Sequence, residues 1–152
     1  MKKICFIAST GGHFEQLIML KPIMDRNDSF IITEKTSYQS IKDGRRTYYL
    51  KQVNRQEKTW IFKMLVNTIE SFKIFIKEKP DLVISTGALA TIPMCLIAKV
   101  FRKKLIFIES FAKINSPTLT GKLLYKFADQ FYVQWKDMMR LYPKGIYKGG
   151  IY

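Results

Sequence analysis

The stretch "KICFIASTGGHFEQL", residues 3–17, places an apolar run, two glycines, a histidine and the start of a helical pattern in that order. The run "KICFIA" is nearly all apolar, which is typical of a strand buried on both faces of a sheet. The two glycines allow a tight turn and a close approach of a ligand to the backbone. The helix that follows would offer unpaired N–H groups to an anion. The stretch therefore predicts a strand–turn–helix unit with His13, the only histidine in the chain, at its turn.

Strand and helix patterns alternate along the rest of the chain. Strands are expected at 29–34, 48–50, 81–86, 104–110 and 130–135, and helices at 14–24, 57–79, 91–102 and 116–128. Pro22 should kink or shorten the first helix, and Ser116 is the expected N-cap of the last. This alternation predicts a parallel sheet covered by helices on both faces. We expect one doubly wound, Rossmann-like α/β domain over residues 1–152.

Ligands of such sheets bind at the carboxyl ends of the strands, so the loops 10–13, 34–36, 86–90 and 109–116 are the candidate sites. His13 is a candidate catalytic base, because a neutral imidazole can accept a proton from a hydroxyl group near neutral pH. Glu109 ends a predicted strand and is the rival base, and the sequence does not decide between them. The other residues of these loops that we expect to contact a ligand are Thr10, Gly11, Gly12, Thr86, Gly87, Asn115 and Ser116.

The charge favours an anionic partner. The chain holds 26 Lys and Arg against 12 Asp and Glu, a net charge of +14. A nucleic acid, a phosphorylated ligand or an acidic membrane surface would fit this field. Cys5 and Cys95 lie in apolar runs, as expected for reduced thiols of a cytosolic protein. No residue spacing suggests a metal site.

Membrane contact, if present, is expected to be peripheral. No apolar stretch approaches the roughly 20 residues of a membrane span, and a strand that starts at residue 3 leaves no room for a signal peptide. The predicted helix 57–79 is apolar over about half its circumference or more, which exceeds the stripe of about 100° that packing on a sheet requires. A basic stretch lies around its start: Lys42, Arg45, Arg46, Lys51, Arg55, Lys58 and Lys63.

An apolar surplus with a basic flank is typical of an interfacial membrane element. A well-buried helix with solvated lysines and a protein-partner face remain alternatives. The expected membrane or partner surface comprises Arg45, Arg46, Trp60, Phe62, Lys63 and Val66.

Three stretches together carry a family resemblance: "TGGH", "DLVISTGALATIP" and "ESFAKINSPTLTGKLLYKFAD". They resemble the acceptor-side half of GT-B glycosyltransferases, including the N-acetylglucosamine transferase that completes the lipid-linked peptidoglycan precursor. The chain looks still more like the membrane-side subunit of the two-subunit UDP-N-acetylglucosamine transferase of lipid-linked oligosaccharide synthesis. Bacterial counterparts of that subunit work in capsule and exopolysaccharide assembly. "FADQFYVQW" and "YKGGIY" also look like this family, and the resemblance covers essentially the whole chain.

The resemblance implies an enzyme split over two chains. This chain would bind a lipid-linked phosphosugar acceptor and dock on an anionic membrane surface. A smaller partner subunit would bind the UDP-sugar donor, so no cofactor and no donor domain are expected in this chain. The eukaryotic subunit has an N-terminal membrane helix and this chain has none. A cytoplasmic protein attached peripherally to the inner face of the cell membrane is therefore expected.

Two other functions compete with this interpretation. The chain has no G-x-G-x-x-G motif, which argues against a self-sufficient nucleotide-binding enzyme of Rossmann type. Glu34, at the end of a predicted strand, keeps this function as an alternative. A nucleic-acid-binding protein would fit the charge, but the chain has no recognisable module and its lysines are spread out. No nucleic-acid partner is expected. The transferred sugar stays open among glucose, galactose, glucuronic acid and N-acetylglucosamine.

Overall fold

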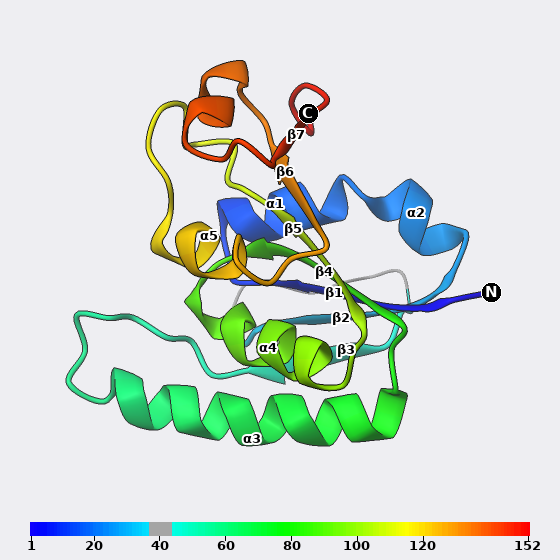
Figure 1. Cartoon of the computed structure of the whole chain (residues 1–152). Helices are drawn as coiled ribbons and strands as arrows, with labels where there is room; N and C mark the ends of the chain where they lie inside the picture. Colours follow the sequence, from blue (N-terminus) through cyan, green and yellow to red (C-terminus); the bar gives the residue numbers. More distant parts are fainter. Residues whose placement is uncertain (37–43) are drawn as a thin grey trace.

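The computed structural model describes residues 1–36 and 44–152, which leaves Lys42 of the basic stretch outside the described residues. In these ranges, parallel strands form one seven-stranded sheet in the order β3-β2-β1-β4-β5-β6-β7 (Figure 1). The strands are β1 Lys3–Ala8, β2 Asp28–Glu34, β3 Thr47–Leu50, β4 Leu82–Gly87, β5 Lys104–Ile108, β6 Gln130–Val133 and β7 Ile146–Tyr147. The expected doubly wound parallel sheet is confirmed. β7 has no counterpart among the predicted strands, because a two-residue strand leaves no periodic pattern to detect.

Helices cover both faces of the sheet, as the alternation predicts. The elements are α1 Gly12–Ile18, α2 Lys21–Asp25, α3 Trp60–Glu78, α4 Ile92–Val100 and α5 Leu119–Leu124, with short 3₁₀ turns η1 Leu89–Thr91 and η2 Lys136–Arg140. Alternate residues of β1 enter two cores. Cys5 and Ile7 pack with α3, α4 and α5, whereas Phe6 and Ala8 pack with α1 and α2.

Two predicted helices differ from the observed ones. The helix expected at 14–24 is split into α1 and α2, with Pro22 in the first turn of α2, where its missing N–H costs nothing. The helix expected at 116–128 is shorter. Its N-cap is Thr118, whose hydroxyl accepts a hydrogen bond from the N–H of Gly121 at 2.8 Å. The prediction of Ser116 as the cap was wrong, because Pro117 and Thr118 still lie outside the helix.

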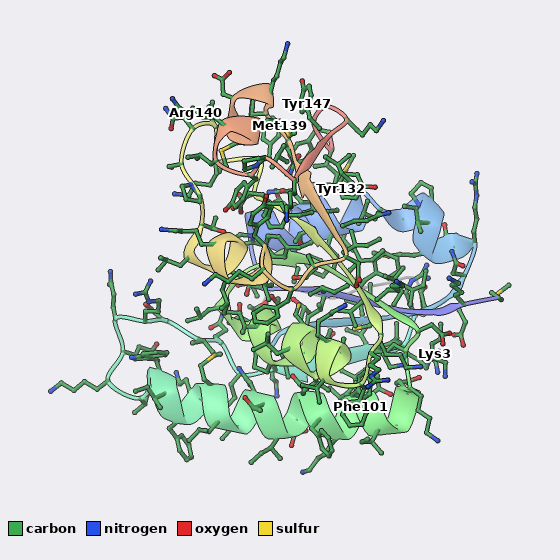
Figure 2. The ribbon with its side chains drawn as sticks, viewed as in Figure 1. Lys3, Phe101, Tyr132, Met139, Arg140 and Tyr147 are labelled. Atoms are coloured by element: carbon green, nitrogen blue, oxygen red, sulfur yellow. The ribbon has the colours of Figure 1, made fainter. Side chains whose placement is uncertain are left out.

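An ion-pair network closes the sheet at the amino ends of its strands. Glu78, at the end of α3 and only 4 % exposed, accepts hydrogen bonds from the Tyr48 hydroxyl at 2.5 Å and from Arg46 at 2.9 Å, and pairs with Lys3 at 3.4 Å. Figure 2 shows Lys3 and Phe101 on this side of the molecule, beside the C-terminal part of α3. The network joins α3 to strands β1 and β3.

This network should make stability pH-dependent. Burial acts to raise the pKa of Glu78, but the hydrogen bond from Tyr48 and the charges of Arg46 and Lys3 outweigh it, so the pKa is lowered. An unfolded chain then takes up this proton before the folded one does, and stability is lost as pH falls below about 4.3. Urea midpoints measured from pH 7 to pH 3 should fall less for Glu78→Gln than for the wild type. The control is Glu57→Gln, which changes an exposed carboxylate and whose urea midpoint should fall with pH as much as that of the wild type. An equal fall of the midpoint in all three proteins would contradict the prediction.

Candidate functional site

The turn after β1 opens the candidate site at the carboxyl ends of the strands. Gly11 has a φ of +73°, a conformation that side chains with a Cβ rarely adopt, and it lets the chain enter α1 directly at Gly12. The N–H of Thr10 donates to the Glu34 carboxylate at 3.1 Å. Both glycines are exposed, so their backbone is accessible at this edge of the sheet.

His13 is held against the end of β4 by Thr86. The imidazole Nδ1 lies 2.8 Å from the carbonyl oxygen of Thr86, and the Thr86 hydroxyl donates to the carbonyl oxygen of His13 at 2.6 Å. Since a carbonyl oxygen only accepts, Nδ1 carries the proton in the neutral ring and the lone pair is at Nε2. The sequence-predicted residues of the loops 10–13 and 86–90 are therefore brought together.

Gly87 gives the imidazole its room. A Cβ built on Gly87 would lie 3.1 Å from Nδ1 of His13, and the φ of Gly87 is +96°. A larger residue at this position would have a strained backbone, and its Cβ would also force the imidazole ring to shift. The glycine at this strand end therefore leaves the space that the histidine ring occupies.

Glu34 is engaged in the scaffold. Its carboxylate accepts hydrogen bonds from the N–H groups of Thr10 at 3.1 Å and Val53 at 2.7 Å, and the residue is 5 % exposed. A ribose would have to displace these bonds to reach the carboxylate. The geometry therefore does not support contact of the Glu34 carboxylate with a ribose, which was the reason to consider a nucleotide-binding enzyme.

Glu109, the rival base, is buried and fully engaged. It is 1 % exposed. Its carboxylate accepts hydrogen bonds from the N–H groups of Ser110 and Thr118 at 3.0 and 3.1 Å, and from the hydroxyls of Thr118 and Tyr142, both at 2.8 Å. Burial, followed by the Glu109 charge, raises the pKa of Tyr142 well above its usual value. Such a carboxylate is placed to hold the loop between β5 and α5 rather than to meet a substrate.

Sequence reasoning missed the partners of Glu109. Gly121 permits the arrangement, since a Cβ there would lie 2.1 Å from Oε2 of Glu109. Tyr142 comes from 33 positions along the chain. The sequence offers a signal only for Thr118, a hydroxyl residue before a helical pattern. Asn115 and Ser116 are exposed on the same loop.

Four of the predicted surface residues lie at the start of α3, and the two arginines lie away from it. Trp60, Phe62, Lys63 and Val66 occupy its first turns, with Phe62 64 % exposed and Lys63 paired to Glu57. Arg45 pairs with Asp25 at 2.5 Å, and Arg46 pairs with Asp28 and with Glu78 at the opposite end of α3. The structure therefore does not bring the two arginines together with the Trp60 end, because a helix of this length spans about 28 Å.

The apolar surplus of α3 faces outward, as its pattern predicts. The polar residues Asn67 and Ser71 are buried, and the Asn67 amide bonds the N–H and carbonyl of Lys51, both at 2.8 Å. In Figure 1, α3 lies along the lower edge of the molecule. Its exposed apolar residues, which we call the α3 face, are Ile61, Phe62, Leu65, Ile69, Phe72 and Ile76. Among the described residues, no helix is long and apolar enough to span a bilayer.

Comparison with known proteins decides the family. A family model described as oligosaccharide biosynthesis protein Alg14 like matches residues 4–151. The chain belongs to this Alg14-like family. The UDP-N-acetylglucosamine transferase subunit ALG14 of Rattus norvegicus is 33 % identical, over 97 % of this chain and 82 % of the rat protein. Membership confirms the predicted class, a glycosyltransferase subunit.

The bacterial resemblance is also confirmed. A UDP-N-acetylglucosamine–N-acetylmuramyl-(pentapeptide) pyrophosphoryl-undecaprenol N-acetylglucosamine transferase of Staphylococcus haemolyticus is 30 % identical over 95 % of this chain, but only 44 % of that protein is covered. The crystal structure of Acinetobacter baumannii MurG matches with a TM-score of 0.73 at 18 % identity, over 90 % of this chain and 43 % of that one. This Alg14-like chain thus has the fold of one half of such an enzyme.

Proposed function

We propose that this chain is the acceptor-binding, membrane-recruiting subunit of a two-chain GT-B glycosyltransferase. The enzyme would transfer a sugar from a UDP-sugar to a lipid-pyrophosphate-linked saccharide in capsular or exopolysaccharide biosynthesis. The observation that carries the proposal is the Alg14-like match over residues 4–151, since named members of the family are transferase subunits. The smaller partner subunit would hold the UDP-sugar, and this chain would need no cofactor of its own.

His13 is the proposed base. Its Nε2 takes the proton of the acceptor hydroxyl while that oxygen bonds to the anomeric carbon of the donor sugar and UDP leaves. The Thr86 carbonyl, 2.8 Å from Nδ1, orients the ring and stabilises the imidazolium that forms. Glu109 is not the base in this scheme, because both of its oxygens are engaged within the protein. The proposed acceptor site is bordered by the remaining predicted loop residues: Thr10, Gly11, Gly12, Thr86, Gly87, Asn115 and Ser116.

The test is reconstitution. This chain and its candidate partner, the product of the neighbouring open reading frame, are expressed together and separately, and sugar transfer to a lipid-pyrophosphate-linked saccharide is measured with each UDP-sugar. Transfer by the pair alone supports the split enzyme. Full transfer by this chain without a partner would overturn the proposal.

The α3 face is the proposed membrane contact, with nearby lysines such as Lys58 and Lys73 facing anionic headgroups. Leu65→Asp with Ile69→Asp should weaken the affinity for anionic vesicles, measured by sedimentation, by about a hundredfold or more, because inserting such side chains is worth about 1.5–3 kcal/mol each. Gln52→Asp with Gln56→Asp adds the same charge at two exposed positions before α3 and should weaken binding much less. Equal losses in the two double variants would show that charge alone recruits the chain.

A further inference from the structure

Two buried glutamine side chains join distant parts of the candidate site. Gln16 lies on α1 and is 4 % exposed; Gln134 follows β6 and is 5 % exposed. The side-chain N–H₂ group of Gln134 donates to Oε1 of Gln16 at 2.7 Å and to the backbone carbonyl of Glu109 at 2.8 Å. This amide pair therefore connects α1 with the end of β5 and the end of β6.

The pair also binds two backbone N–H groups. Oε1 of Gln16 accepts from the N–H of Phe111 at 3.1 Å, and Oε1 of Gln134 accepts from the N–H of Ile151 at 2.9 Å. The connection thus extends to the segment 149–152. Apolar side chains at these two positions would leave both partly buried N–H donors without these acceptors, so the amides match the backbone around them.

The ring of Phe111 lies where the same elements meet. Its centroid is 5.0 Å from those of Trp135 and of Tyr152, and the Trp135 indole donates to the Phe111 carbonyl at 2.7 Å. A Cβ built on Gly150 would lie 3.0 Å from the Phe111 ring. Segment 149–152 therefore packs on the loop that follows Glu109 as well as bonding to Gln134.

We propose that Gln16 and Gln134 are positioning residues that couple segment 149–152 to His13. Gln16 follows His13 by three positions, one turn of the same short helix, so an anchor on Gln16 fixes the direction of that helix. The helical turn from His13 to Gln16 is therefore held at both ends, by the hydrogen bond of His13 to Thr86 and by that of Gln16 to Gln134. Directional hydrogen bonds in a buried setting keep this geometry better than apolar packing does. The catalytic consequence rests on the proposed function, whereas the structural coupling does not.

The first readout needs no activity. His13 is the only histidine, so the ring C–H resonances of the imidazole report on it alone in an NMR spectrum of the full chain. Gln16→Met and Gln134→Met should each move these resonances by more than their line width. Gln130→Met, the same change at an exposed position of β6, should not move them. Unmoved His13 resonances in folded Gln16→Met and Gln134→Met would overturn the coupling.

A milder variant covers the case in which a glutamine variant does not fold. Gly150→Ala adds one methyl group against Phe111 at an exposed position, and it should also move the His13 resonances. Lys148→Ala, two positions earlier and exposed, is its control. A shift of the His13 resonances in both Gly150→Ala and Lys148→Ala, or in neither, would contradict a coupling through Phe111 and Gln134.

The second readout uses the reconstituted pair. Gln134→Met should lower kcat by about tenfold to a hundredfold while the KM for the UDP-sugar is unchanged, because a base displaced by about 1 Å costs this much. The double variant Gln16→Met with Gln134→Met should be no slower than either single one, as for two residues acting as a unit. An unchanged kcat beside shifted His13 resonances would overturn the catalytic part. A wild-type pair with no transfer, beside shifted resonances, would instead overturn the proposed function and leave the coupling standing.

Discussion

Gly121→Ala should destabilise the chain by about 3 kcal/mol or more, a large part of the stability of a domain this size. The added Cβ would lie 2.1 Å from Oε2 of Glu109 and 2.8 Å from the Thr118 hydroxyl. Glu109 cannot move away without breaking the hydrogen bonds that it accepts from Thr118 and Tyr142. The measurement is the urea midpoint, or the soluble yield if the variant does not fold.

Gly12→Ala is the matched control. A Cβ at Gly12 meets nothing within 4 Å, and Gly12, the first residue of α1, has no positive φ, so alanine should stabilise the chain by about 0.4–1 kcal/mol. Its urea midpoint should stay at or above that of the wild type. A wild-type midpoint for Gly121→Ala would mean that Glu109 is not held as described, and Glu109 would then return as a candidate base.

His13→Ala should lower transfer by the reconstituted pair by about 10²–10⁴-fold, the usual contribution of a general base. The fold should survive, because His13 is only partly buried and the bond from the Thr86 hydroxyl goes to its backbone oxygen. Initial rates of sugar transfer, measured with equal amounts of folded wild-type and variant chain in the reconstituted pair, test the role directly.

Glu109→Gln separates the two candidate bases. The amide replaces one acceptor oxygen by a donor facing the hydroxyl and N–H donors of this cluster, so stability should fall. The folded fraction should still transfer sugar at close to the wild-type rate. The reverse result, a wild-type rate in His13→Ala and a lost one in folded Glu109→Gln, would assign the chemistry to Glu109.

Local pattern is enough to predict the sheet and the place of the histidine. Apolar runs buried on both faces are a property of each strand, and their alternation with helices leaves essentially one parallel architecture. A strand followed by two glycines and a helix is a local arrangement, and it places His13 at a strand end. The outward α3 face is also predictable, because the angular width of an apolar stripe is counted along one helix.

Tertiary structure alone decides which polar groups are accessible. Glu109 and His13 both follow strands and look equivalent in the sequence. They differ because Thr118 and Tyr142 fold onto Glu109, whereas Thr86 and Gly87 leave His13 partly exposed. The link from Gln16 to Ile151 is equally hidden, since its two glutamines are 118 positions apart. The burial and hydrogen bonding of a side chain depend on residues far away along the chain. A local sequence pattern does not show which distant residues will pack against it.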